Sequence, residues 1–427
     1  MVYQHSKRVN TTALMQSLMA GFSERTGLSG ESAISRRYLW TDAFAVCNFI
    51  ELYRETGDAE FIQKALTLVD QVHHVLGRFR DDDSRHGWIS GFSETDGADH
   101  PACGGLRIGK DLGERTPHDP FDERSEWDRD GQYFHYLTKW MHALDLVARV
   151  TGEPRYHQWA VELAKAAHAG FCYTPFPGAR HSLHWKISID LSYALVPSMG
   201  HHDPLDGFIT CQQLKAGLAV FGGTDTDFDL ENEIAELAGM CADTSWKTMD
   251  ALGIGGLLTD ACRLTQLILF HGLHETELLD SLLRDAESSL GAWARLRSLN
   301  YPVSNRLAFR ELGLSIGLSA ILKMQELTGQ HTHALSFHGG LKDTLARISP
   351  YTRLRETIEE FWIRPENQES GGWLKHREIN TVMLATSLGP EAFLKLDGHP
   401  ESRREVTFSR PPTAPCRASF ETPPSLP

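Results

Sequence analysis

One local pattern recurs along the chain and constrains its fold more than any other feature. Each copy is a helix-like segment that ends in Thr-Gly and is followed by a short polar turn and a second amphipathic segment. The copies are centred on Thr56-Gly57, Thr151-Gly152 and Thr328-Gly329. A glycine directly after the last helical turn adopts the left-handed conformation that ends a helix and reverses the chain. The pattern therefore predicts a repeated helical hairpin, which favours a toroid or solenoid over an ordinary bundle.

Apolar residues at helical spacing continue this rhythm along the chain. We expect early helices over 10–24, 40–53, 61–76, 131–150 and 155–169. We expect later pairs at 204–221 with 228–242, 250–271 with 276–297, 305–327 with 331–347, and 352–364 with 375–388. Repeated glycines within 251–270 and 306–324 predict helices that approach each other closely. Strand-like alternation is almost absent, so the predicted class is all-α.

The domain organisation follows from where the helical rhythm stops. Residues 1–397 are expected to form a single domain, and 398–427 a proline-rich C-terminal tail. Within the domain, residues 79–126 are rich in Asp, Gly, Pro and His and show no sustained periodicity. A loop of this length inside a compact domain is usually functional or disordered. We interpret it as a rim loop whose glycines allow it to move as a lid.

Composition excludes several classes of partner. The formal net charge of −14 argues against nucleic acid or an anionic membrane surface as a partner. Apolar runs fall short of the roughly 18–20 residues that a membrane span needs. The N-terminus lacks the pattern of a secretory signal peptide, so a cytoplasmic protein is expected. The seven cysteines are scattered without a C-x-x-C pair, which favours reduced thiols.

The hairpin rhythm over about 35–390, together with the T-G-[DE]-x-x-[FY] turn, resembles the six-hairpin (α/α)6 toroids. That superfamily includes unsaturated glucuronyl and rhamnogalacturonyl hydrolases, other glycosidases, and the N-acylglucosamine and cellobiose 2-epimerases. The signature of no single member family is matched. The resemblance implies an (α/α)6 toroid, a double ring of hairpins around a central cup, and carbohydrate chemistry within that cup.

Aromatic and acidic residues cluster where several inner helices are expected to begin, at 36–42, 125–133, 184–190, 200–207 and 372–378. In a toroid these starts converge on one rim. Aromatic faces stack on sugar rings, and carboxylate, arginine and histidine side chains bond to hydroxyl groups. Taken singly, such an acid is more often a helix N-cap, and such a tryptophan more often belongs to the core. Their co-occurrence predicts a saccharide-binding rim made of Arg37, Trp40, Trp88, Glu126, Trp127, Tyr133, Trp185, Asp190, His201, His202, Trp373 and His376.

Carboxylic acids are the predicted catalysts. Glycoside cleavage needs one protonated carboxylic acid and usually a second carboxylate as base or nucleophile. A crowded acidic rim raises some pKa values by like-charge repulsion, while adjacent arginines lower others. Our first hypothesis is a glycoside hydrolase in which Asp128 or Asp130 is the general acid/base, opposed by Asp42 or Asp203. Two further candidate partners are Asp190 and Asp206.

Two alternatives stay open. A sugar 2-epimerase or isomerase would use rim histidines to move a proton next to a carbonyl, and the candidates are His184, His201, His202 and His376. A non-catalytic scaffold of helical repeats would spread its aromatic and charged residues along the repeats. The irregular polar loop 79–126 favours an enzyme over a scaffold.

No cofactor or metal is predicted. A dinucleotide-binding G-x-G-x-x-G after a strand, a P-loop and a G-x-S-x-G elbow are all missing from the sequence. Adjacent His201 and His202 point about 100° apart on a helix, and Asp225–Asp229 lacks the later Glu and central Gly of a calcium loop. For zinc, the thiols weighed have no suitable histidine neighbour: Cys211, Cys241 and Cys262. The expected partner is a small molecule, a mono- or oligosaccharide.

Overall fold

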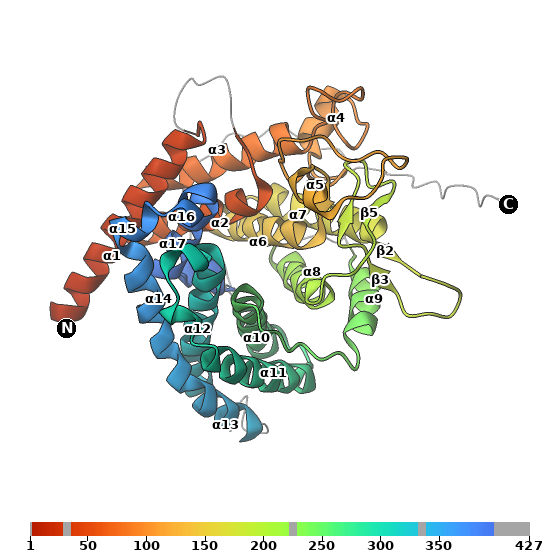
Figure 1. Ribbon diagram of the computed structural model, residues 1–427. Coiled ribbons are helices and arrows are strands. Elements are labelled where there is room, and N and C mark those ends of the chain that lie inside the picture. Colours follow the sequence, from red (N-terminus) through yellow and green to blue (C-terminus); the bar gives the residue numbers. More distant parts are fainter. Residues whose placement is uncertain (1, 29–35, 222–228, 332–338, 397–427) are drawn as a thin grey trace.

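A closed ring of six helices forms the inside of the molecule (Figure 1). The computed structural model describes residues 2–28, 36–221, 229–331 and 339–396. Each inner helix contacts the next, and the last contacts the first. In chain order they are α2 (Leu39–Thr56), α6 (Phe134–Thr151), α8 (Asp203–Phe221), α10 (Ala251–His271), α12 (Ala308–Gln330) and α17 (Arg377–Leu388). The predicted all-α class and (α/α)6 toroid are confirmed.

A second layer of helices packs against the outside of this ring. Behind the inner helices, in ring order, lie α3 (Ala59–Leu76), α7 (Pro154–Phe171), α9 (Glu231–Cys241), α11 (Thr276–Arg295), the consecutive α13 (Gly339–Ile348) and α14 (Arg353–Ile363), and α1 (Val2–Arg25). Short helices complete the C-terminal part: α15 (Pro365–Gln368), α16 (Gly371–Lys375) and α18 (Glu391–Leu394). Single 3-10 turns occupy Ser298–Asn300, Val303–Asn305 and Ser349–Thr352.

The two ends of the chain together form the sixth hairpin. Helix α1 packs against α17 and buries Met15, Met19 and Phe22. Helix α14 packs mainly against α12. The predicted pairing of 352–364 with 375–388 as the last hairpin was therefore wrong. Sequence order favours neighbouring partners, whereas a closed ring lets the first helix cover the last.

Two of the three Thr-Gly copies end a helix as predicted. Gly57 and Gly152 adopt left-handed conformations with φ of 72° and 74°. In these copies the threonine hydroxyl accepts a hydrogen bond from the N–H two residues later, which starts the turn. At Gly329 the prediction was wrong, because α12 continues to Gln330. The backbone N–H of His331 still bonds to the carbonyl oxygen of Leu327, so the helical hydrogen-bond pattern continues past Gly329.

Glycines allow α10 and α12 to approach each other closely, as the sequence predicts. A Cβ added to Gly255 would lie 2.1 Å from the carbonyl oxygen of Gly313, and one added to Gly317 would lie 2.6 Å from Cα of Gly255. Contacts this short leave no room for a methyl group. These positions therefore set the distance between two walls of the ring.

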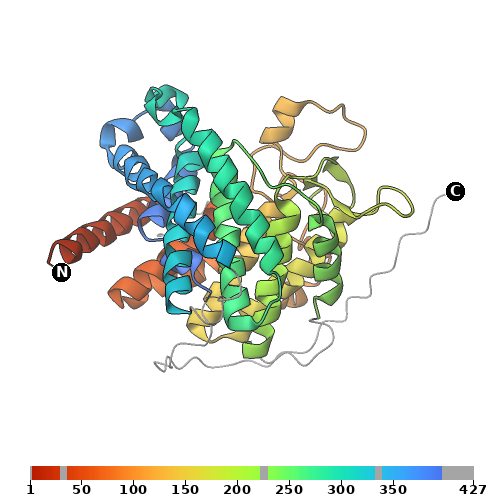
Figure 2. The ribbon, with the colours of Figure 1, turned by 90° about the horizontal axis from the view of Figure 1, so that it is seen from below.

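The rim loop 79–126 lies at one end of the helices, where Figure 2 shows it in orange. It contains α4 (Glu94–Asp99) and α5 (Glu123–Asp128). Beside it lies an antiparallel sheet of β1 (Gln132–Tyr133), β4 (Lys186–Ile187) and β5 (Ala194–Val196). A separate hairpin pairs β2 (Cys172–Tyr173) with β3 (Ser182–Leu183). The predicted 398–427 tail lies outside the described residues.

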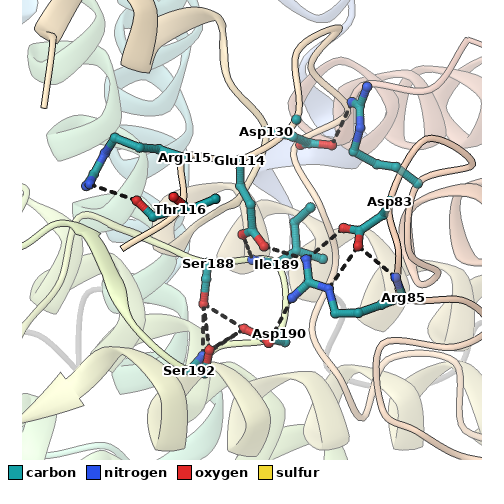
Figure 3. Close-up of polar contacts among 12 residues, drawn as sticks. Asp83, Arg85, Glu114, Arg115, Thr116, Asp130, Ser188, Ile189, Asp190 and Ser192 are labelled. Atoms are coloured by element: carbon teal, nitrogen blue, oxygen red, sulfur yellow. Dashed lines mark hydrogen bonds and ion pairs between the residues drawn. The ribbon is translucent and has the colours of Figure 1, made fainter. Parts of the chain in front are cut away.

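Ion pairs tie the rim loop to the sheet region (Figure 3). The guanidinium of Arg85 contacts Asp83 at 2.7 Å, Glu114 at 2.5 Å and Asp190 at 2.8 Å. The second oxygen of Glu114 accepts a hydrogen bond from the backbone N–H of Ile189. The loop is therefore packed onto the strands at several points.

Helix α10 is long and apolar enough to cross a membrane by length and composition. In the structure it is an inner helix of the ring, and 72% of its most apolar window is buried. A core helix passes the same test, so this is weak evidence for a span. The six cysteines among the described residues form no disulfide.

Candidate active site

A cavity of about 1320 Å³ opens where the inner helices begin. Residues from the first turns of all six inner helices line it, among them Trp40 of α2, His135 of α6, Asp203 of α8, Gly253 of α10, Arg310 of α12 and Arg377 of α17. We call this cavity the cup. Its place agrees with the prediction that the helix starts converge on one rim. The rim loop borders it as well, through Gly109–Leu112.

The structure brings ten of the sixteen predicted site residues to the cup. These are Arg37, Trp40, Asp42, Trp127, Asp128, Trp185, His201, His202, Asp203 and His376. The six that do not line it are Trp88, Glu126, Asp130, Tyr133, Asp190 and Trp373. Of the acids near 126–130, only Asp128 reaches the cup, and it is exposed at the mouth.

Three predicted acids are held in ion pairs outside the cup. Asp130 is fully buried and accepts hydrogen bonds from Arg107 at 2.6 Å and from the backbone N–H of Gly109 at 2.9 Å. Glu126 lies 2.9 Å from Lys186, and Asp190 pairs with Arg85 as described above. These carboxylates fasten the rim loop and the sheet. Their clustering in the sequence therefore reflects loop anchoring, and it argues against Asp130 as the acid/base.

Three predicted aromatic residues belong to the packed interior. Trp88 is 2% exposed, and the Arg78 guanidinium lies over its ring. Trp373 is buried and stacks on Trp362 at 5.8 Å between ring centroids. Tyr133 is buried directly behind the cup wall, where its ring contacts that of Trp185. The burial of Trp88 and Trp373 follows the general tendency of tryptophan side chains to lie in protein cores.

A chain of aromatic rings forms one side of the cup. Trp127 is 49% exposed and meets Trp185 edge to face at 5.0 Å between centroids. Further in, His135 lies parallel to Trp185 at 6.4 Å, and Trp40 meets Tyr136 at 5.3 Å. An exposed tryptophan beside a half-buried one gives the mouth of the cup a flat apolar surface. Flat apolar faces of this kind suit the apolar faces of sugar rings.

The carboxyl of Asp203 and the imidazole of His135 face each other across the start of α8 and α6. Asp203 Oδ1 lies 3.7 Å from His135 Nδ1. Both Asp203 Oδ2 and His135 Nδ1 are buried and make no hydrogen bond within the part of the chain that the structure describes. Buried polar atoms are nearly always bonded, so each exception asks for an explanation. Because both residues line the cup, a bound ligand is the explanation that their position supports.

Two buried carboxyls share one arginine at the cup. Arg263 Nη1 lies 3.1 Å from Asp206 Oδ1 and 3.3 Å from Asp260 Oδ1. Asp206 also accepts hydrogen bonds from Lys139 and Thr138. Although burial opposes it, the Lys139 and Arg263 cations hold the pKa of Asp206 below its usual range. Burial, followed by repulsion from Asp206, raises the pKa of Asp260. The pKa values of two adjacent carboxyls are therefore shifted in opposite directions, as acid/base sites require.

Asp42 is a third buried carboxyl in the cup wall. Its Oδ2 accepts a hydrogen bond of 2.9 Å from the backbone N–H of Tyr38, so it caps the start of α2. Arg37 lies 3.5 Å from its other oxygen. Burial raises the pKa of Asp42 to about 6 despite the arginine and the backbone bond. The residue thus combines the capping role with a proton that it can hold near neutral pH.

The four histidines predicted for the rim differ in their hydrogen bonds, their pKa values and their exposure. His202 Nε2 bonds to the carbonyl oxygen of Trp246 at 3.0 Å, and burial lowers its pKa. Burial also lowers the pKa of His376, with a further contribution from Lys375 and Lys110. His201 is exposed at the mouth. His184 does not line the cup and stacks on Tyr173 instead.

The orientation of the inner helices favours negative charge in the cup. Helix N-termini carry a partial positive charge and unpaired N–H groups. All six inner helices present this end to the cup, as their lining residues show. Anionic groups there, whether carboxylates of the protein or negative charge that develops during a reaction, are therefore stabilised.

Sequence reasoning missed Asp260 and His135 and gave Asp206 only a secondary place. The signal for Asp260 is present in the sequence, because Asp260 and Arg263 stand at helical spacing inside an otherwise apolar helix. Burying two charged side chains in such a position costs desolvation free energy, so their presence indicates a function or further polar partners. His135 and Lys139 stand one turn apart on α6 in the same way. The clusters considered in the sequence ended at Tyr133, just before His135, and Asp260 lies deeper in the cup, in the third turn of α10.

Clusters able to hold a metal ion lie elsewhere among the described residues. One joins His100, Cys103 and Glu162, and the other joins His168, Cys172 and Glu236. All six residues lie outside the cup lining. Each cluster includes a residue of the outer helix α7 or its C-terminal end.

Comparison with known proteins supports the fold. No family model matches the chain, and no curated protein matches it. The chain is structurally similar to a GH76 α-mannanase of Bacteroides thetaiotaomicron, with a TM-score of 0.51 and 8% identity over 90% of this chain and 97% of the mannanase. Weaker likenesses are to a cellobiose 2-epimerase of Bacillus thermoamylovorans (TM-score 0.43, 9% identity) and to a sugar epimerase of a ruminal bacterium (TM-score 0.42, 10% identity). Each of these two covers 82% of this chain and 87% of the other. The protein therefore has the six-hairpin (α/α)6 fold.

Proposed function

We propose that the protein is a carbohydrate-active enzyme that hydrolyses a glycosidic bond in the cup. The observation that carries this proposal is the set of buried carboxyls with separated pKa values in one cavity, Asp206 and Asp260 around Arg263. Glycoside hydrolysis needs a protonated acid to assist the leaving oxygen, and a second carboxylate. The likeness to a solved α-mannanase supports an (α/α)6 enzyme and places α-mannosides first among substrates to test.

We assign the role of general acid to Asp260. Burial and repulsion from Asp206 raise its pKa, so it holds its proton to a higher pH than an ordinary aspartate, and it lines the cup. Asp203 is our candidate for the base or nucleophile, since no described residue bonds to its Oδ2. His135 would orient Asp203 or bond a sugar hydroxyl through its own free nitrogen. The rings of Trp127 and Trp185 would stack on the sugar at the mouth.

A second candidate function is epimerisation of a free reducing sugar. The observation that favours it is His376, whose lowered pKa leaves a neutral imidazole in the cup, able to accept a proton near pH 7. His135, with its free nitrogen, would be the second proton carrier. This reaction needs no carboxylic acid beside the leaving oxygen, which separates it from hydrolysis.

The test is a panel of α-mannosides, other aryl glycosides, unsaturated uronides and free reducing disaccharides, followed by proton NMR of the anomeric signals. Hydrolysis by the wild type that is lost in Asp260→Asn and Asp203→Asn supports the first proposal. Epimerised sugar that persists in those variants but is lost in His376→Gln supports the second. Failure to convert any of these substrates would contradict the assignment to carbohydrates.

A further inference from the structure

Four side chains with metal-binding atoms converge on the outside of the ring, remote from the cup. His168 and Cys172 stand one helical turn apart at the C-terminal end of α7, so they share a face. Glu236 faces them from α9, and His181 approaches from the loop that joins β2 to β3. The residues thus come from three separate segments of the chain.

Four of the six distances among these atoms are close to those of a tetrahedral site, and the ligand atoms of His168, Cys172 and Glu236 all lie within 4.8 Å of one another. His168 Nε2, Cys172 Sγ and His181 Nδ1 lie 3.1, 3.2 and 3.3 Å from Glu236 Oε2. Cys172 Sγ lies 3.7 Å from His181 Nδ1. Zinc binds nitrogen and oxygen at about 2.0–2.2 Å and sulfur at about 2.3 Å, so tetrahedral ligands lie about 3.3–3.7 Å apart. Side chains in this arrangement need only small movements to enclose a cation.

Hydrogen bonds inside the cluster do not account for it. Three donors converge on the single oxygen Glu236 Oε2, of which only the Cys172 thiol makes an aligned bond. His168 Nε2 is buried and makes no hydrogen bond to any residue that the structure describes. A cation would bond all of these atoms at once.

We propose that His168, Cys172, Glu236 and His181 bind a divalent cation of the zinc class. One thiolate, two imidazoles and one carboxylate are ligands that zinc prefers, and four protein ligands make the closed site of a structural metal. On binding, the Cys172 thiol loses its proton to solvent and its sulfur bonds to the metal, so the site releases one proton per cation from this group.

The cation would fasten the β2–β3 hairpin to α7 and α9. His181 precedes β3, and Trp185 of the cup follows β3 within a few residues. His184, between them, stacks on Tyr173 of β2 at 4.0 Å. A metal at the base of this hairpin therefore fixes the segment that carries one aromatic face of the cup. The inference concerns a site separate from the proposed reaction and stands without it.

Cobalt(II) is the probe, because a cobalt–thiolate bond absorbs in the near ultraviolet. Full-length protein is stripped with a chelator and titrated with cobalt chloride, and zinc is then added in competition. We expect thiolate absorption that saturates at about one cobalt per chain and disappears on adding zinc. Zinc at about 100 times its Kd should raise the melting temperature by about 3 °C.

Cys172→Ser should abolish the thiolate absorption, and Glu236→Gln should weaken cobalt binding at least tenfold. The matched control is Cys103→Ser, which alters the other cluster, where His100 already makes a 2.7 Å bond to Glu162. That control should bind cobalt as the wild type does. Far-ultraviolet circular dichroism shows whether each variant is folded. A folded wild type without thiolate absorption, or absorption that Cys103→Ser removes and Cys172→Ser retains, would overturn the proposal.

Discussion

Asp203 of α8 faces His135 of α6 at 3.7 Å, and each has a buried polar atom that finds no hydrogen-bond partner among the described residues. An unbonded buried polar group costs about 1–3 kcal/mol. Such a cost is tolerated where a ligand completes the bonds. The pair therefore marks the part of the cup where we expect substrate hydroxyls or the reacting oxygen to lie.

Replacing Asp203 by asparagine should reduce kcat/KM by about 10²–10⁴, the usual contribution of a general acid or base. The free energy of unfolding should change by less than about 1 kcal/mol, because Oδ2 makes no hydrogen bond among the described residues and Oδ1 makes only a long contact of 3.7 Å with His135. Steady-state kinetics and urea denaturation measure the two effects. Asp99→Asn, at an exposed aspartate outside the cup, is the matched control. Equal kinetics in the two variants would contradict the role of Asp203.

Asp42 should make stability depend on pH in a way that asparagine does not. Its folded pKa, about 6, lies above the ordinary value of 3.8, so the folded state holds the proton more tightly. The contribution to stability is then complete below about pH 4 and is lost as pH rises through about 6. The shift of about two units corresponds to roughly 3 kcal/mol.

The measurement is the free energy of unfolding of wild type and Asp42→Asn between about pH 4 and pH 8. Relative to the wild type, the variant should gain up to roughly 3 kcal/mol over this range, whatever constant offset the lost N-cap bond to Tyr38 adds. A difference that is flat with pH would mean that Asp42 keeps an ordinary pKa in the folded protein.

Close packing of α10 on α12 predicts that alanine substitutions at two adjacent glycines, Gly255 and Gly256, change the stability of the protein in opposite directions. Gly255→Ala places a methyl group 2.1 Å from a carbonyl oxygen of α12, so we expect a loss of about 1–3 kcal/mol or more. At Gly256 an added Cβ meets nothing within 4 Å, so alanine should stabilise the helix by up to about 1 kcal/mol. Thermal unfolding of both variants tests this. Equal destabilisation would contradict the close approach.

Trp185→Ala should raise KM for a saccharide with less effect on kcat, because the ring contacts bound sugar rather than the reacting bond. Loss of one aromatic contact is worth about 0.5–1.5 kcal/mol, or roughly three- to tenfold in KM. Trp373→Ala is the matched control, because that ring is buried against Trp362 outside the cup. It should lower the melting temperature and leave the KM of the folded enzyme unchanged. A larger KM effect at Trp373 would contradict the placement of the binding surface.

The fold was predictable because hairpin rhythm and helix ends are local properties. Gly57 and Gly152 mark real helix ends, and the glycines of α10 and α12 mark a real close approach. Which helices pack against each other was harder to predict from the sequence. Ring closure pairs α17 with α1, from the opposite end of the chain, and no local pattern in either helix encodes that contact.

The site was predictable where it uses helix starts. Asp42 and Asp203 reach the cup from helix starts as expected, whereas Trp185 reaches it from just before β4, where the expected helix start at 184–190 is a strand. The cluster of acidic residues around Asp130 predicted that this residue lies in the cup, which it does not. A loop anchored by arginines contains the same residue types as an acidic rim, so the sequence alone does not separate the two. Asp260 was missed because its raised pKa comes from burial in the assembled ring and from repulsion by Asp206, a residue of another helix.

The most direct test of acid catalysis in the cup is the pH dependence of kcat/KM for wild type and Asp260→Asn, with aryl glycosides of good and poor leaving groups. In the wild type, hydrolysis should decline as pH rises through the raised pKa of Asp260. In the variant that alkaline limb should vanish, and activity should fall steeply for the poor leaving group while the good leaving group, which needs no proton, is largely spared. An unchanged alkaline limb, or equal loss with both leaving groups, would contradict Asp260 as the acid.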